Sequence, residues 1–441
     1  MVLLVLIWAA VAAPLTLDVV LEAVDARVPA LAAAEAKLTE AEAKLLSARG
    51  AFDPKLAAKA SAYTGKYARE ELDSKLLLPT ALGPEVELGW RRGVGEFPSY
   101  DDSYTADAGE LRVGVSAPLL EGLGLGAERA KLLDGRLGQQ SAEASLDDKR
   151  IQVRRKAEEA WWKWVAAGAS AQIALRQLEL AVERDRALQV EVREGSRALI
   201  EQLDNERVLF ERRGKLALAD QKLGTAALVL SLWFRDADGL PVVPAPDQLP
   251  ALAPPGLSER GLQADVASAE RRPDLRVLLA EVQRGEVAAA RGRNLVLPRL
   301  DGKVEARQDL TDEPTEVVLG AELSVPLWLR KGRGERDRAS AALAQASQAE
   351  RGLRDQVRAD VAAAHLAREA SAEWAEWSLL AAERAEQVLA LQRRSWDLGA
   401  SDLFVLLQRE GKLAEAREKA VEAQLQLALA DVALRAVVGE L

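Results

Sequence analysis

The sequence contains no cysteine, a single histidine (His365) and a single methionine (Met1) among its 441 residues. Without cysteine the chain can form no disulfide, no thiolate metal site and no thiol nucleophile. One histidine leaves no histidine cluster for a metal ion and few routes to a histidine-based catalytic triad. We therefore expect the protein not to be an enzyme, and we expect it to bind no metal and no cofactor.

Aromatic residues are also scarce, at 4% of the chain, whereas hydrophobic residues make up 49% and charged residues 29%. The apolar residues are mostly alanine, leucine and valine, which is typical of long helices and coiled coils. The formal net charge is −10, from 59 basic and 69 acidic residues. This balance argues against a nucleic-acid partner, because such a partner favours a basic face.

Residues 1–13 (MVLLVLIWAAVAA) are an apolar run that is too short to span a bilayer as a helix. They suit the hydrophobic region of a secretory signal peptide, although no basic residue precedes Arg27. We predict a signal peptide over 1–13 and export of the chain. The alternative is the start of a buried strand or helix. No later segment is long and apolar enough for a membrane-spanning helix, so any membrane span must consist of strands.

Proline is absent between Pro118 and Pro241 and again after Pro326. Because proline breaks helix interiors, these two stretches can hold very long helices. A turn-like glycine segment interrupts each stretch once, so we expect helices over about 128–194, 197–233, 335–398 and 401–438. A helix of some 65 residues would be about 100 Å long.

The order and spacing of these features occur twice. The interval from Pro29 to Pro54 is repeated from Pro273 to Pro298, and the glycine turns fall at corresponding places in the two halves. We predict a tandem duplication with a first repeat over 14–234, a proline-rich linker over 235–272 and a second repeat over 273–441. Each repeat is expected to contain a short helix, a β-hairpin (54–118 and 298–326), a long helix, a turn and a shorter helix.

Side chains alternate in chemistry through the predicted strands of the second hairpin. Charged residues fall on one face, and apolar or small residues on the other; examples are Arg299, Asp301 and Lys303 against Leu300, Gly302 and Val304. Residues 110–117 repeat the pattern in the first half. Strands of this kind suit a barrel with lipid outside and water inside. The alternative is an antiparallel sheet that packs on helices and turns its charged face to solvent.

This pattern predicts four strands per chain, which are too few to enclose a lumen. Three copies would supply a twelve-stranded transmembrane barrel, so we expect a homotrimer. The first hairpin exceeds the second by a surplus over about 69–108, which contains Trp90, Phe97, Tyr100 and Tyr104. An aromatic girdle at the membrane interface, a structured external loop or ordinary packing could explain these residues.

Several short motifs carry a resemblance to a known family. They are ARGAFDP at 48–54, RPDL at 272–275, SAPLL at 116–120, SVPLW at 324–328 and LGASDL at 398–403. Because these motifs occur together and in this arrangement along the sequence, the chain resembles the TolC-like outer-membrane efflux proteins (outer membrane factors). The strand-to-helix turns would then lie at Pro118, Gly122, Pro326 and Gly332.

The resemblance implies a trimeric barrel in the outer membrane of a Gram-negative bacterium that continues into an α-helical tunnel in the periplasm. It implies an exit duct of a tripartite efflux or type I secretion system, with outer-membrane lipid, a periplasmic adaptor protein and an inner-membrane pump as partners. The adaptor would dock at the two helical turns, at Gly195, Ser196, Leu199, Gly399, Ala400, Ser401 and Leu403. The alternative function is a soluble periplasmic coiled-coil adaptor or scaffold.

The resemblance further implies an acidic constriction just beyond the second turn, where this chain instead has Val405 and Gln408. Glu201 and Asp204 stand at the corresponding places of the first half. The candidate residues of the lumen gate are therefore Glu201, Asp204, Asp402 and Gln408.

Three further features have simpler explanations. The GxGxxA match at 122–127 lacks the compact βαβ unit that dinucleotide binding requires. The basic segment 330–334 (RKGRG) could hold a phosphate, but a basic strand-to-helix turn is simpler. His365 is expected to be a residue of helix packing.

Overall fold

The computed structural model describes residues 14–99, 104–253, 256, 260–310 and 314–441, so the predicted signal peptide lies outside the described residues. The chain divides into two compact units. The first comprises residues 1–34, 146–273 and 354–441, and the second comprises residues 35–145 and 274–353. Three helices contribute more than one residue to each unit, namely α2 (Pro29–Arg49), α3 (Ala127–Arg193) and α7 (Arg330–Asp397).

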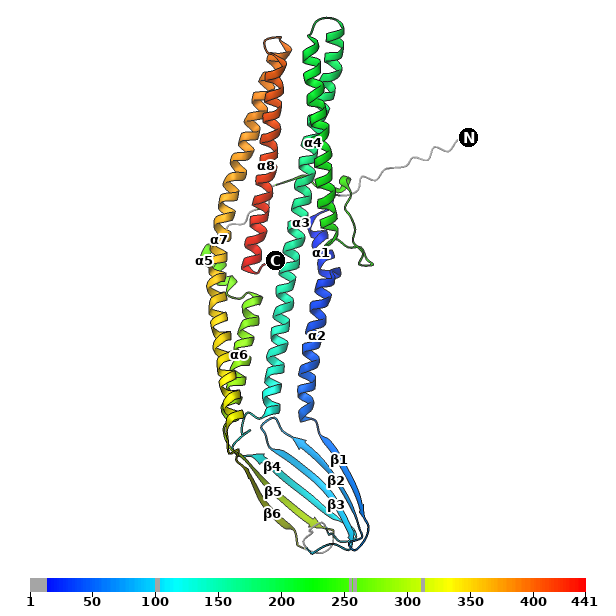
Figure 1. Ribbon diagram of the computed structural model, residues 1–441, viewed down its shortest axis with the longest axis vertical. Coiled ribbons are helices and arrows are strands. Elements are labelled where there is room, and N and C mark those ends of the chain that lie inside the picture. The colour runs from blue at the N-terminus through cyan, green and yellow to red at the C-terminus, as the bar shows by residue number, and fades with distance from the viewer. Residues whose placement is uncertain (1–13, 100–103, 254–255, 257–259, 311–313) are drawn as a thin grey trace, which may run out of the picture. The chain divides into compact units, whose positions relative to one another are not determined.

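The first unit is helical and is built around two helical hairpins (Figure 1). The chain turns from α3 into α4 (Leu199–Ser231) at Gly195, and from α7 into α8 (Leu403–Val438) at Gly399. Both glycines have positive φ, at 73° and 71°, which residues with a Cβ adopt at a cost. The linker contains the 3-10 helix Pro246–Gln248 and the short helix α5 (Leu262–Ala269).

A hydrophobic core holds α1 (Leu17–Arg27) against α3 and α4. Val20, Val24, Trp164 and Leu230 are fully buried there, and the indole N–H of Trp161 donates to the carbonyl oxygen of Leu15 at 3.3 Å. The tryptophans of this helix therefore serve packing between helices.

None of the helices in the described residues combines the length and the apolar character that a membrane span requires.

The second unit contains one antiparallel sheet with the strand order β1-β2-β3-β4-β5-β6 (Figure 1). The strands are β1 (Lys55–Tyr63), β2 (Arg69–Pro79), β3 (Glu85–Gly95), β4 (Glu110–Pro118), β5 (Arg299–Asp309) and β6 (Glu316–Ser324). A 3-10 helix, Gly50–Phe52, precedes β1. In the same unit α2 packs on α3 where Gly135 meets Leu45, and α6 (Pro273–Asn294) packs on α7 where Gly285 meets Leu343.

The prediction of four strands per chain was wrong, because the segment 54–118 forms four strands instead of one hairpin. The surplus over 69–108 supplies β2 and β3, joined by a turn in which the Thr80 hydroxyl donates to the Pro84 carbonyl oxygen at 2.7 Å. Sequence alternation failed to reveal this pair because Leu76 to Leu78 form an unbroken apolar run and β3 contains three glycines.

The aromatic residues of this segment pack locally. The indole N–H of Trp90 donates to the Ala108 carbonyl oxygen at 3.2 Å, and the rings of Phe97 and Tyr104 meet edge to face at 5.7 Å. Tyr100 lies outside the described residues.

Candidate functional site

The strand register separates the sheet into an apolar face and a charged face. One row across all six strands is entirely apolar, and it consists of Leu56, Leu76, Leu88, Val113, Ala306 and Val317. A row on the opposite face is entirely charged, and it consists of Lys59, Asp73, Arg91, Glu110 and Asp309; the charge alternates as far as Glu110. The two-faced pattern expected for residues 110–117 and the second hairpin therefore extends to the other strands of the sheet.

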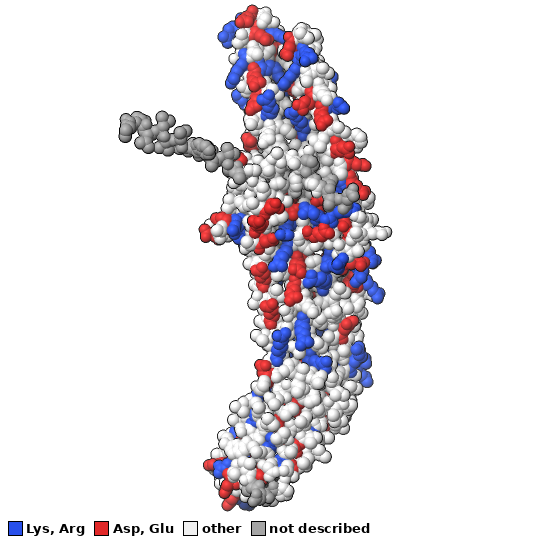
Figure 2. Space-filling view, turned by 180° about the vertical axis from the view of Figure 1, so that it is seen from behind, with Lys and Arg blue, Asp and Glu red and all other residues white. Residues whose placement is uncertain are grey.

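The apolar face is more exposed than the charged face. The apolar Val317 is 63% exposed, whereas the charged Glu305 is only 1% exposed. Figure 2 likewise shows mostly uncharged surface over the strands and many charged residues over the helices. A flat, uncovered sheet would expose both faces alike, so the sheet curls with its charged face on the concave side and its apolar face outward.

Ion pairs link residues both between strands and within one strand on the concave face. Arg112 of β4 reaches across β3 to Asp73 of β2 at 2.7 Å, and Gly89 of β3 leaves room for this side chain. Arg91 lies 3.4 Å from Glu110, and Arg307 lies 2.7 Å from Glu305. Because a shift by one residue would turn these charges to the apolar face, the pairs favour a single register.

The two edge strands carry opposite charges on the concave face. β1 contributes Lys55 and Lys59 and no acidic residue, whereas β6 contributes Glu316 and Glu322 and no basic residue. Each of these strands has a partner on one side only in the sheet. The edges are thus complementary in charge, and their outer faces are both apolar.

The two helical turns share one construction. Gly195 and Gly399 end α3 and α7, and the Ser196 hydroxyl donates to the Glu191 carbonyl oxygen at 2.9 Å. Asp402 caps α8 by accepting the Val405 backbone N–H at 2.9 Å. These caps satisfy backbone groups that a helix end leaves without partners.

Arg197 connects the two turns. Its guanidinium lies 4.2 Å from the centre of the Trp396 ring, and it also pairs with Glu191 at 3.3 Å and Glu201 at 3.4 Å. A stacked and doubly paired arginine is a stronger link than an isolated surface ion pair.

The structure places most of the predicted docking residues on the surface of the turns. Gly195, Ser196, Leu199, Gly399 and Ala400 are exposed, and Ser401 is half-buried, where it accepts a hydrogen bond from the Gln392 amide. Leu403 is different, at 5% exposed, because it is the first residue of the buried seam of α8. Its side chain therefore packs within the chain.

The candidate gate residues fall into two groups. Asp204 and Gln408 line one groove between α4 and α8, together with Phe404. Glu201 is held by Arg197, and Asp402 is occupied as the helix cap. The structure thus brings Asp204 and Gln408 together and gives the other two local roles.

Sequence reasoning missed a buried charge cluster around Glu410, which is fully buried on α8. Its carboxylate pairs with Arg184 of α3, with Arg212 of α4 at 2.8 Å and with Arg393 of α7 at 3.4 Å. Burial raises the pKa of this carboxyl, but Arg184 and Arg212 lower it more, so the net pKa lies below the ordinary value of 4.5. Glu410 therefore remains ionised and ties four helices together.

A heptad pattern could have revealed this cluster. Along α8 the buried apolar seam includes Leu406, Leu413, Ala420, Leu427 and Leu434, while every seventh residue beside it is polar: Glu410, Arg417, Gln424 and Asp431. Arg417 pairs with Glu386 of α7 at 2.9 Å, and Asp431 pairs with Arg368 of α7 at 3.1 Å. Polar residues at such positions fix the register of a coiled coil.

His365 packs between helices, as expected, but it also makes a polar contact. Its Nε2 atom lies 2.9 Å from a carboxylate oxygen of Asp265, which pairs in turn with Arg260 at 3.3 Å. This contact ties α5 of the linker to α7.

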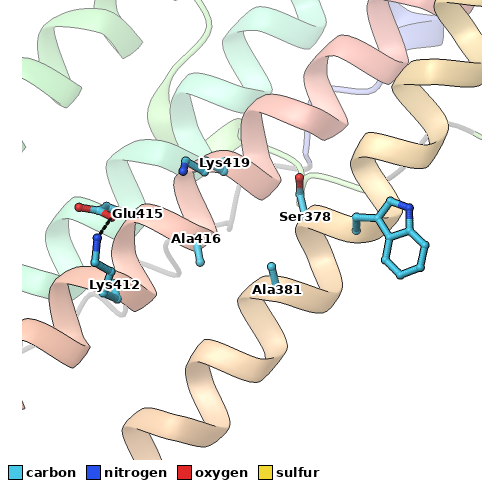
Figure 3. Close-up of a pocket in the computed structure, with 7 residues that line it drawn as sticks. Ser378, Ala381, Lys412, Glu415, Ala416 and Lys419 are labelled. Carbon is cyan, nitrogen blue, oxygen red and sulfur yellow. Dashed lines mark hydrogen bonds and ion pairs between the residues drawn. The ribbon is translucent and has the colours of Figure 1, made fainter.

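A hollow between α7 and α8 has no chemically distinctive lining (Figure 3). Ser378 and Ala381 face it from α7, and Lys412 and Glu415 of α8 form an exposed ion pair at 2.9 Å. Across the described residues, no group of three or more acidic or histidine side chains could hold a metal ion.

The strand-to-helix turns are held by α6 and β5. The Gly122 backbone N–H donates to the Asn294 side-chain oxygen at 2.6 Å. At Gly332 a Cβ would overlap the carbonyl oxygen of Leu295, so only glycine fits without movement. Pro118 and Pro326 stand where β4 and β6 lead into these turns.

Comparison with known proteins shows what part of the chain is similar to. Residues 266–440 match the outer membrane efflux protein family. The resemblance predicted from the sequence is confirmed, and the family is one of channels, not of enzymes. No curated protein sequence matches the chain significantly.

Solved structures match almost the whole chain at low identity. The CmeC outer membrane channel of Campylobacter jejuni has a TM-score of 0.69 and 13% identity, covering 96% of this chain and 85% of that chain. The outer membrane protein VceC of Vibrio cholerae has a TM-score of 0.67 and 15% identity, covering 96% of each chain. The open state of the MtrE channel of Neisseria gonorrhoeae has a TM-score of 0.68 and 17% identity, covering 96% of this chain and 88% of that chain. At this identity the likeness shows a shared fold.

Proposed function

We propose that three copies of this chain form a channel in the outer membrane of a Gram-negative bacterium, which serves as the exit duct of a tripartite efflux or type I secretion system. The observation that carries the proposal is the curled sheet, with an exposed apolar face outside, a charged face inside and complementary edges. A sheet of this chemistry suits lipid on the convex side and water on the concave side.

The edges specify how copies join. In an antiparallel pairing of β1 with β6 of a second copy, Lys55 and Lys59 would face the strand that carries Glu316 and Glu322. Leu56 and Leu319, both exposed, would meet on the outer face. Three copies would contribute eighteen strands in place of the twelve expected from the sequence, and closure would leave no free edge.

The helical unit offers surfaces for the same assembly. Exposed apolar residues follow one side of α7, namely Leu366, Trp377, Leu380 and Leu391, and another set follows α4, namely Ile200, Leu203 and Phe210. Apolar stripes of this kind on long helices favour packing against further helices. We propose that α3, α4, α7 and α8 of three copies form the wall of a tunnel.

Partners would act at the helical turns. A periplasmic adaptor linked to an inner-membrane pump would dock on the exposed residues Gly195, Ser196, Leu199, Gly399 and Ala400. Movement of the turns would separate Arg197 from Trp396 and change the groove that contains Asp204 and Gln408. Opening would thus depend on repacking of a two-state coiled-coil element.

Detergent extraction and planar-bilayer recording test the proposal. The full chain is expected to leave the membrane only with detergent, to run as a heat-modifiable trimer and to conduct ions in a bilayer. A monomer that is freely soluble without detergent would contradict it and support the alternative, a periplasmic coiled-coil adaptor or scaffold.

A further inference from the structure

An unassigned surface of the second unit lies where β6 passes into α7. Leu327 and Trp328 connect the two elements and are 85% and 73% exposed. Arg330, Lys331 and Arg333 follow in the first turn of α7, and all three are exposed. These five residues are called the junction patch below. An exposed aliphatic and aromatic pair is thus followed directly by three cations.

The cations occupy an electrostatically unfavourable place. The N-terminus of a helix carries a partial positive charge, so acidic residues are stabilising there and basic residues are not. α7 has no acidic residue in its first turn, whereas α3, which begins at the equivalent junction of the first half, has Glu128. Basic residues at a helix N-terminus oppose the helix dipole, and such an unfavourable arrangement points to a functional site.

No acidic side chain of the described residues is paired with the cations of the patch. Among the described residues, no side-chain hydrogen bond or ion pair engages Arg330, Lys331 or Arg333. The acids of the next turn are already engaged, because Asp337 pairs with Arg336 at 2.9 Å and Glu335 pairs with Arg338 at 2.7 Å. The three cations are therefore available to attract an anion or an anionic lipid surface.

The position of the patch is fixed by tight packing. Gly332, between the cations, lies so close to the Leu295 carbonyl oxygen that a Cβ would overlap it. The Arg333 backbone N–H donates to the Leu329 carbonyl oxygen at 2.9 Å, which joins the connecting segment to the helix. The cations therefore project from an anchored turn that needs no ordering when it binds a partner.

We propose that the junction patch binds the headgroups of anionic phospholipids at the surface of the bilayer, with Leu327 and Trp328 at the depth of the interface and the three cations on lipid phosphates. The apolar outer face of β6, with Val317, Leu319 and Leu323 exposed, leads directly into the patch. Tryptophan is enriched at membrane interfaces, and basic residues close to the membrane surface attract anionic lipid. This inference rests on the proposed function, since it requires that the outer face of β6 meets lipid.

Reconstitution of the full chain tests the inference. The protein is mixed with vesicles of phosphatidylcholine alone, or of phosphatidylcholine and phosphatidylglycerol in equal amounts. Two quantities are measured: the inserted, protease-resistant fraction, and the phosphatidylglycerol retained per chain after detergent extraction. Wild-type protein is expected to prefer the mixed vesicles and to retain phosphatidylglycerol.

The triple variant Arg330→Gln, Lys331→Gln, Arg333→Gln should lose this preference, by about fivefold for each charge removed. Trp328→Ala should lower insertion into both vesicles alike.

The matched control removes three exposed cations of the first unit, with Arg186→Gln, Arg193→Gln and Arg394→Gln. It should keep the wild-type lipid preference. If wild type and the junction variant insert equally into both kinds of vesicle, the inference fails and the channel proposal stands. If wild type inserts into neither, the channel proposal fails. A last outcome concerns inorganic phosphate in detergent. If wild type binds it, the junction variant does not, and wild type shows no lipid preference, then the patch binds a soluble anion and the lipid assignment is overturned.

Discussion

At the scale of single residues, Glu410 is a buried carboxylate that joins four helices of the helical unit. Removing one member of a buried ion pair leaves the others buried without a partner, which costs more than the pair contributes. Glu410→Gln would leave Arg184, Arg212 and Arg393 without their common anion. We expect a loss of about 3–5 kcal/mol in the free energy of unfolding, measured by thermal and denaturant melts.

The matched control for this prediction is Glu415→Gln, on the same helix. Glu415 forms an exposed pair with Lys412. Exposed pairs contribute little, so its melting temperature should equal that of the wild type. Equal melting temperatures for both variants would show that the buried cluster does not stabilise the fold.

Glu410 also leads us to expect that the stability of the fold depends on pH. The pKa of Glu410 is lowered in the folded chain from an ordinary value of 4.5, because Arg184 and Arg212 outweigh its burial. Its stabilising contribution is therefore fully present above pH 4.5 and is lost as the pH falls through the lower, folded value. Melting curves from pH 7 down to pH 3 should show wild-type stability falling toward that of Glu410→Gln. A constant difference between the two proteins across this range would contradict the prediction.

A glycine at the strand-to-helix turn gives a third prediction at this scale. Gly332→Ala places a methyl group on the Leu295 carbonyl oxygen, whereas Gly334→Ala, two residues further along α7, meets only open space. We expect the first to lower the yield of folded protein and the melting temperature. The second should raise stability slightly, since alanine favours a helix by about 1 kcal/mol. The opposite order of the two melting temperatures would contradict this packing argument.

At the scale of elements, the edge strands of the sheet carry the strongest prediction. Lys55→Glu would place a like charge against the edge of the next copy that carries Glu316 and Glu322. Like charges on paired strands are destabilising by up to about 1 kcal/mol each. The trimer fraction on native gels should therefore fall. Adding Glu322→Lys, which lies opposite Asp301 within the chain, should restore it, while Lys37→Glu on the exposed side of α2 should have no effect. A double variant as defective as Lys55→Glu alone would exclude this edge pairing.

Elements also show which parts of the fold the sequence could predict. The long helices were predictable because proline cannot occupy a helix interior, and the observed bounds of α3, α4 and α8 lie within two residues of those expected. β5 and β6 were predictable because their alternation is nearly unbroken. β2 and β3 were not, because Leu77 lies on the charged face and Gly89 and Gly93 carry no side chain to signal a face.

The candidate site also has parts that the sequence could predict and parts that it could not. The turns at Gly195 and Gly399 were visible from composition, since glycine supplies the positive φ that ends a helix. The Glu410 cluster was hidden because its partners Arg184 and Arg212 lie far away in sequence, and pairing across helices follows no local period. Only the polar residue at every seventh position of α8 hinted that the seam contained charge.

At the scale of the whole molecule, the number of strands would set the size of the pore in the proposed trimer. With six strands in each chain, three copies give a wider barrel than four strands per chain would, since barrel diameter grows roughly in proportion to strand number. Electron microscopy of the purified trimer should show eighteen strands, and single-channel conductance should exceed that of a variant without β2, β3 and their turn. A twelve-stranded barrel in the wild type would contradict the assembly.

The pair β2 and β3 has a consequence for how this architecture can diversify. An inserted hairpin crosses the sheet once in each direction, so the chain emerges on the side from which it entered. The helices that precede and follow the hairpin can therefore keep their positions. In the proposed trimer, gain or loss of such a hairpin would therefore change the width of the barrel and leave the helical turns as they are.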